Sequence, residues 1–124
     1  MKSVQTDKAP KAIGPYSQAV VAGDLVFCAG QVGLTPTGEM VAGGVKEQTD
    51  QVLKNLAAVL EAAGAGMNSI TMVNVYLRSM GDFAAMNEVY GKAFGEHKPA
   101  RATVAVSELP KNALVEISCV ASLK

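Results

Sequence analysis

A chain of 124 residues is long enough to bury about two thirds of its unfolded surface, so we expect one domain over residues 1–124 that needs no disulfide or metal ion to fold. Hydrophobic residues make up 49% of the sequence, which argues against disorder, and the apolar runs are too short to cross a bilayer, so no membrane partner is expected. The 11 basic and 11 acidic side chains cancel and no segment concentrates positive charge, which argues against nucleic acid as a partner.

Both cysteines, Cys28 and Cys119, lie in apolar, strand-like runs. A free thiol in such a run usually packs as a small hydrophobic side chain. We therefore expect two free thiols and a reducing, cytoplasmic compartment. The first five residues contain no apolar segment of the kind found in signal peptides, so neither a signal peptide nor a transit peptide is expected.

The first 40 residues predict a short edge strand followed by a loop and a hairpin. The loop, shaped by Gly and Pro, exposes the hydroxyl of Tyr16, which is a candidate pocket residue. Gly23 provides the positive φ that a tight hairpin turn needs. Gly30, at the end of the second hairpin strand, marks either a bulge or a close approach of the backbone to a ligand or another chain. The predicted elements are an edge strand within residues 1–10, a loop at 13–17, strands at 18–21 and 25–29, and a turn at 34–40.

The middle of the chain predicts two helices with a strand at 70–78 between them. Apolar residues recur with a period of 3.6 over about 19 residues after Gly43, and Gly64 ends this helix. Asn55 lies beside the buried stripe, where an amide more often holds backbone in place than takes part in chemistry. Asp82 is expected to cap the second helix. Its apolar stripe contains one polar residue, Asn87, which is either a satisfied core amide or a group at the rim of a site.

The C-terminal part of the chain predicts an antiparallel hairpin with arms at 99–106 and 114–120. Polar and apolar side chains alternate along both arms, and a register that kept every charge out of the core would place Arg101 and Glu116 on one polar face. The small neighbours of Arg101 leave its guanidinium unshielded, which suits bidentate binding of a ligand carboxylate. The alternative is a surface salt bridge without a function, which is common between strands.

The order of predicted elements indicates an α+β sandwich in which a mixed sheet carries both helices on one face. The other face would combine Thr103, Glu116 and Arg101 with several apolar side chains. Such a face is too apolar to stay exposed and too polar for the core of a monomer, so we expect a homo-oligomer.

The residues exclude several kinds of chemistry. His97 is the single histidine and lies in a charged loop, which argues against a Ser/His/Asp or Cys/His catalytic arrangement and against a metal site. No nucleotide-binding fingerprint is present, and no cofactor is expected. What remains is Arg101 to hold an anion, Glu116 to orient or deprotonate a water, and Tyr16 and Asn87 as neutral hydrogen-bond donors. This set suits a reactive imine, which needs only protonation, addition of water and loss of ammonia.

Six short motifs, spread over nearly the whole chain, stand together in this sequence: residues 13–19, 29–31, 61–64, 99–101, 109–110 and 115–117. In order and spacing they resemble the RidA (YjgF, reactive intermediate deaminase) family. The resemblance implies a chorismate-mutase-like α+β fold and a homotrimer with a central barrel and three sites in the clefts between subunits. It also implies hydrolysis of 2-iminobutanoate and 2-iminopropanoate to 2-keto acids and ammonia without a cofactor.

The resemblance also implies roles for individual residues. The arginine that matches Arg101 grips the substrate carboxylate, and the glutamate that matches Glu116 positions the attacking water; we take both as catalytic. Two positions depart from the family pattern: Ala29 stands where many members have serine, and Thr103 where several have cysteine. Losing one hydroxyl contact is worth roughly 0.5 to 1.5 kcal/mol, enough to change substrate preference. The expected substrate-binding residues are Tyr16, Ala29, Gly30, Asn87 and Thr103.

Two other functions are weighed against the deaminase. A trimeric protein that binds carboxylates for regulation, without turnover, is favoured by the missing hydroxyl at Ala29. The endoribonuclease or translation-inhibitor role also attached to the family is opposed by the zero net charge and by the absence of a basic or aromatic platform for RNA.

Overall fold

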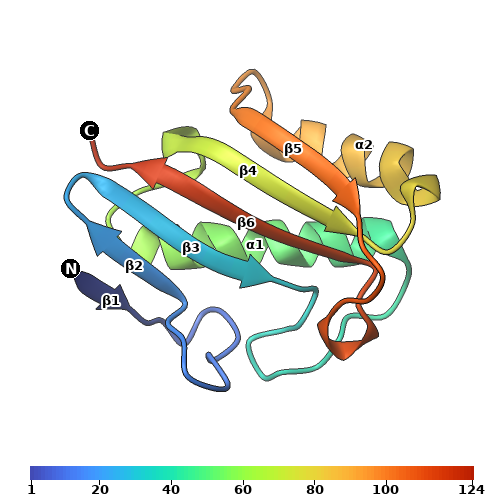
Figure 1. Cartoon of the computed structure of the whole chain (residues 1–124), viewed down its shortest axis with the longest axis horizontal. Helices are drawn as coiled ribbons and strands as arrows, with labels where there is room; N and C mark the ends of the chain where they lie inside the picture. The colour runs from blue at the N-terminus through green and yellow to red at the C-terminus, as the bar shows by residue number, and fades with distance from the viewer.

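The computed structural model describes all residues, 1–124, and shows a six-stranded mixed sheet with two helices on one face (Figure 1). The strands lie in the order β1-β2-β3-β6-β4-β5, and only β4 and β5 run parallel. The predicted α+β class, mixed sheet and single helical layer are confirmed. The elements are β1 (Lys2–Val4), β2 (Ala19–Ala22), β3 (Leu25–Gln31), α1 (Val45–Ala62), η1 (Met67–Ser69), β4 (Ile70–Leu77), η2 (Met80–Asp82), α2 (Phe83–Phe94), β5 (Ala100–Ala105), η3 (Pro110–Asn112) and β6 (Val115–Ser122).

The N-terminal hairpin forms as predicted. Ala22 pairs with Leu25 across the turn, and Gly23 adopts a φ of 60°, which glycine reaches without a steric penalty. The register between β3 and β6 shifts between Cys28 and Gln31, so Gly30 lies in a bulge. The bulge ends the regular pairing of β3 at one end of the sheet.

Both helices are followed by a glycine with positive φ, as predicted. Gly64 after α1 has a φ of 87°, and Gly95 after α2 has a φ of 61°. A side chain is disfavoured in this region, so glycine ends the helices at low cost. Asp82 occupies the N-cap position of α2, but its side chain makes no capping hydrogen bond.

The core lies between the sheet and the helical layer, and Asn55 is a buried polar residue in it whose side chain is hydrogen-bonded. Asn55 Nδ2 donates hydrogen bonds to the carbonyl oxygens of Val32 at 3.3 Å and Leu34 at 2.9 Å, which fixes the loop after β3. Cys28 and Cys119 are cross-strand neighbours of β3 and β6, and both are buried and free. The structural role predicted for Asn55 and the two free thiols are therefore confirmed.

The predicted C-terminal hairpin is wrong, because β4 lies between its two arms. β5 pairs parallel to β4, with Val73 opposite Arg101, while β6 pairs antiparallel to the other edge of β4. A parallel pair needs a crossover, and α2 provides it. The loop after β5 then crosses the end of β4, where Val106 N–H donates to the Leu77 carbonyl at 2.8 Å and Arg78 N–H to the Leu114 carbonyl at 3.2 Å.

The inserted strand also changes which residues share a face. Residues directly opposite each other in a sheet point to the same side, so Arg101 lies on the same face as buried Val73, toward the helices. Glu116 lies opposite Tyr76, which is three residues after Val73 in β4 and therefore points to the other, open face. The prediction that Arg101 and Glu116 share a face is wrong.

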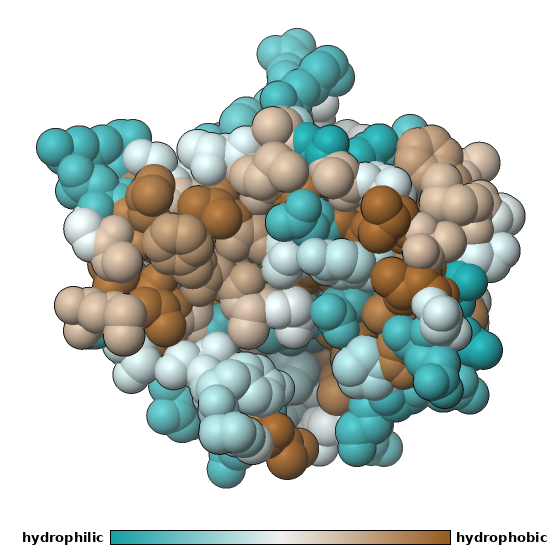
Figure 2. Space-filling model, viewed as in Figure 1, coloured by the Kyte–Doolittle hydropathy of each residue, from teal (hydrophilic) through white to brown (hydrophobic).

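The open face of the sheet carries a mixture of apolar and polar side chains. Phe27, on the interior strand β3, is 44% exposed, and Val104, on the edge strand β5, is 48% exposed. Figure 2 shows apolar side chains gathered on this face, mainly toward the turn between β2 and β3, with polar groups among them. No helix has the length and apolar character needed to span a membrane.

Candidate active site

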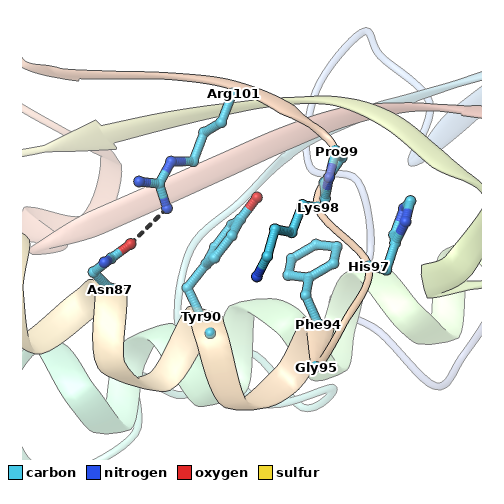
Figure 3. Close-up of a pocket in the computed structure, with 9 residues that line it drawn as sticks. Asn87, Tyr90, Phe94, Gly95, His97, Lys98, Pro99 and Arg101 are labelled. Carbon is cyan, nitrogen blue, oxygen red and sulfur yellow. Dashed lines mark hydrogen bonds between the residues drawn. The ribbon is translucent and has the colours of Figure 1, made fainter.

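Arg101 extends from β5 toward α2, as Figure 3 shows. Its Nη1 donates a hydrogen bond to Asn87 Oδ1 at 2.7 Å, and its guanidinium carbon lies 4.7 Å from the ring centroid of Tyr90 and 5.5 Å from that of Phe83. Aromatic faces attract a cation, so three side chains of one helix hold the guanidinium in place. The prediction that this group is unshielded is wrong, since α2 covers one side of it.

A pocket of about 440 Å³ opens beside Arg101, between α2 and the loop that leads to β5. Its wall carries two cations, Lys98 and Arg101, and no carboxylate. Asn87 is exposed at this pocket, which decides between the two alternatives left open for it in favour of the rim of a site. We call this the Arg101 pocket, and it is lined by Asn87, Tyr90, Gly91, Phe94, Gly95, His97, Lys98, Pro99 and Arg101.

Tyr90 lines the pocket as well, although it is a buried residue of α2. Its ring lies under the Arg101 guanidinium, and burial raises the pKa of its hydroxyl while the positive charge of Arg101 opposes that rise. The signal that identifies it is its spacing of three residues from Asn87, which places both side chains on one side of the helix. In Figure 3, Tyr90 and Phe94 project from α2 into the same space as Lys98.

A second pocket, of about 580 Å³, lies where β3 ends and β6 begins, beside the N-terminal loop. It brings together Tyr16, Ala29, Gly30 and Glu116, which come from three separate segments of the chain. Two lysines, Lys11 and Lys111, also line it. We call it the Glu116 pocket, and its lining residues are Pro10, Lys11, Ile13, Tyr16, Gln18, Ala29, Gly30, Gln31, Val32, Leu34, Pro110, Lys111 and Glu116.

Within this pocket the Glu116 side chain lies directly over Gly30. A Cβ atom on Gly30 would stand 2.6 Å from Glu116 Oε2, closer than any ordinary contact, so the carboxyl occupies the space that a side chain would fill. Burial raises the pKa of Glu116 above its usual value. The glycine allows this close approach, and a raised pKa favours a carboxyl that takes up and returns a proton.

The remaining candidate chemistry is limited. His97 Nε2 lies 2.8 Å from the carbonyl oxygen of Ile70, so the single histidine makes a structural hydrogen bond, and Figure 3 shows its ring pointing away from Arg101. No group of three or more His, Cys, Asp or Glu side chains lies close enough together to hold a metal ion.

Comparison with known proteins agrees with this arrangement of elements and residues. The family model described as Endoribonuclease L-PSP matches residues 6–123, nearly the whole chain. The chain belongs to this family, the YjgF/RidA family. The resemblance found in the sequence motifs is thereby confirmed.

Relatives in the YjgF/RidA family carry several names. A RutC family protein of Pyrococcus horikoshii is 57% identical over 117 residues, which cover 94% of this chain and 93% of the relative. Reactive Intermediate Deaminase A of Arabidopsis thaliana, a chloroplast protein, is 48% identical over 97% of this chain and 65% of its own length. A protein of Dermatophagoides farinae named 2-iminobutanoate/2-iminopropanoate deaminase is 46% identical over 94% of this chain and 92% of its own length.

Solved structures of family members have the same fold. A protein of Thermotoga maritima described as a putative endoribonuclease superposes with a TM-score of 0.97 at 50% identity, covering 100% of this chain and 98% of that one. TdcF of E. coli, solved with bound serine, superposes with a TM-score of 0.94 at 40% identity, covering 98% of each chain.

The site residues predicted from the sequence are divided between the two pockets. Arg101 and Asn87 line the Arg101 pocket, whereas Tyr16, Ala29, Gly30 and Glu116 line the Glu116 pocket. Thr103 lines neither: it points to the helical side of β5, two residues after Arg101, and its Oγ1 is buried without a hydrogen-bond partner. Sequence reasoning missed the aromatic support from Tyr90 and the lysines of both pockets.

Proposed function

We propose that this RidA-family protein hydrolyses 2-iminobutanoate and 2-iminopropanoate to 2-keto acids and ammonia, at a site formed between two copies of the chain. The observation that carries the proposal is the division of the candidate residues between two pockets on opposite faces of one sheet. Within one chain Arg101 and Glu116 have no common cavity. A substrate that needs both groups requires the Arg101 pocket of one subunit to meet the Glu116 pocket of the next.

The open face of the sheet supports an assembly of this kind. It exposes large apolar side chains, including Phe27 and Val104, that water solvates poorly. Burying this face against other copies would remove that exposure and bring β5, an edge strand, close to a neighbouring subunit. The number three comes from the family resemblance, and we propose a homotrimer on that basis.

The proposed reaction assigns one step to each group. Arg101 binds the substrate carboxylate through its planar donors, and Asn87 and the rings of α2 fix its orientation. Glu116 takes a proton from a water as the oxygen bonds to the imine carbon, and it passes that proton to the nitrogen. Glu116 then transfers the proton of the new hydroxyl to the amino group, the C–N bond breaks as the keto group forms, and the nitrogen leaves as ammonia. Tyr16 supplies a hydroxyl donor at the rim of the same pocket.

The properties of Glu116 and the names of two relatives support this reaction. Burial raises the pKa of Glu116, and a carboxylate with a raised pKa is a stronger base toward the attacking water than an ordinary carboxylate. The Arabidopsis and Dermatophagoides relatives are named as deaminases, and TdcF holds serine, a ligand with a carboxylate.

One observation favours a second candidate, a carboxylate-binding protein without turnover. Ala29 contributes no hydroxyl to the wall of the Glu116 pocket, which leaves one fewer donor or acceptor near the reacting atoms. Such a protein would still bind keto acids through Arg101. A ligand-dependent rise in Tm without turnover would favour this candidate over the deaminase.

The test couples a threonine dehydratase acting on L-threonine to trapping of the released imine by semicarbazide. Active protein suppresses semicarbazone formation and leaves total keto acid unchanged. Arg101→Ala and Glu116→Gln are each expected to abolish the suppression while retaining the wild-type Tm within a few degrees. Unchanged trapping with the wild-type protein would refute the deaminase proposal for this substrate.

A further inference from the structure

Most of the Lys and Arg side chains that form no salt bridge line the two pockets. Of its 11 Lys and Arg residues, five form salt bridges with carboxylates elsewhere on the surface. Four of the remaining six line the pockets: Lys98 and Arg101 in one, Lys11 and Lys111 in the other. The only carboxylate in either lining is Glu116. A protein with zero net charge therefore concentrates unpaired positive charge where the substrate would bind.

Lys111 is also held in a strained backbone conformation. It has a φ of 58° and a ψ of 24°, and Asn112 after it also has a φ of 58°, in the left-handed region that side chains other than glycine rarely adopt. Arg78 Nη1 stabilises this turn by donating a hydrogen bond to Asn112 Oδ1 at 2.8 Å. Strain of this kind persists where surrounding contacts enforce it, and it clusters at binding sites. Here it places a lysine, rather than a glycine, on the wall of the Glu116 pocket.

The size of this pocket exceeds what the smallest substrates need. With the first carboxylate at Arg101 of the neighbouring subunit and the imine carbon beside Glu116, the rest of the substrate extends into a space of about 580 Å³. A methyl or ethyl group fills a small part of that volume. Two lysines without carboxylate partners remain, and a second carboxylate on the substrate would complement them.

We propose that the site accepts 2-imino acids of four or five carbons that carry a second, terminal carboxylate, and that Lys11 and Lys111 bind this carboxylate. The assignment rests on the proposed function for the placement of the first carboxylate and of the reacting carbon. It adds a substrate class and two specificity-determining residues to the Glu116 pocket. The chemistry at the imine carbon is unchanged.

The first test measures binding and does not depend on turnover. The Tm of the wild-type protein is compared in equal concentrations of 2-oxoglutarate and 2-oxobutanoate, which differ by the terminal carboxylate group. The larger rise is expected with 2-oxoglutarate, and Lys111→Gly or Lys11→Met should reduce it to the rise seen with 2-oxobutanoate. Glycine suits the left-handed backbone at this position, so Lys111→Gly removes the charge without adding strain. Lys111→Arg keeps the positive charge, so it should retain the larger Tm rise with 2-oxoglutarate.

The matched control is Lys2→Met, because Lys2 lacks a carboxylate partner and lines neither pocket. It removes the same charge from the protein and should leave both Tm shifts unchanged. Equal shifts for the two keto acids in the wild type, or an equal loss with Lys2→Met, would overturn the assignment.

The second test measures kcat/KM for the imines released when flavin oxidases act on L-glutamate and on L-2-aminobutyrate. Lys11→Met and Lys111→Gly should each lower kcat/KM about 10-fold for the dicarboxylic imine and less than about 2-fold for the monocarboxylic one. An equal loss of kcat/KM for both imines would mean that the lysines attract anions in general. It would overturn their proposed role in binding the second carboxylate. If the wild type hydrolyses neither imine but the Tm difference holds, the deaminase proposal fails and the ligand class stands.

Discussion

Mixing two inactive variants tests whether the site is shared between subunits. Arg101→Ala removes the anion-binding group of one pocket, and Glu116→Gln removes the carboxylate of the other. Each variant alone should lose about 100-fold or more in kcat/KM, since one loses the group that binds the substrate carboxylate and the other loses the general base. In a co-refolded equal mixture, each site of the proposed assembly would join the Arg101 pocket of one subunit to the Glu116 pocket of another.

Random assembly then gives about one quarter of the sites both intact groups, so about one quarter of wild-type activity should return. The assay is the semicarbazide trapping of the threonine dehydratase product, with each unmixed variant refolded in parallel. The matched control mixes Arg101→Ala with the double variant Arg101→Ala/Glu116→Gln, in which no site regains the arginine. Recovery no greater than in this control would refute a composite site, because a site built within one chain cannot be complemented.

Three further results are expected from the same geometry. Gly30→Ala should lower kcat by about 10-fold or more with little change in Tm, because the new Cβ displaces the flexible end of Glu116; an unchanged kcat would contradict the contact. Activity should fall as the pH drops through the raised pKa of Glu116, at a higher pH than an ordinary carboxyl would give. Glu116→Gln should be more stable than the wild type in urea at pH 7, because burial opposes ionisation of the carboxyl in the folded protein. A less stable variant would count against this reading. Asn87→Ala should raise KM several-fold with a smaller change in kcat, because Arg101 loses the hydrogen bond that orients it, and an unaltered KM would argue against that role.

Local features of the fold could be predicted from the sequence because they depend on neighbours in the chain. The turn at Gly23 and the helix ends at Gly64 and Gly95 each follow from the residue type at that position. The pairing of β5 and β6 could not be predicted in this way. Alternation shows which residues of a strand share a face, but it does not show which strand lies beside it or which face meets the helices.

The position of β5 at the edge of the sheet explains why the alternation misled the assignment of Arg101. A charge on the helical face of a central strand would be buried in the core at a high cost, so an apolar face normally marks the helical side. On an edge strand the same face reaches the boundary of the domain, where α2 supplies Asn87 and Tyr90 to hold the guanidinium. Arg101 can then face the helices and still be available to a neighbouring subunit. Glu116, on a central strand, gains access only through the open face, so a reaction that needs both groups requires the assembly.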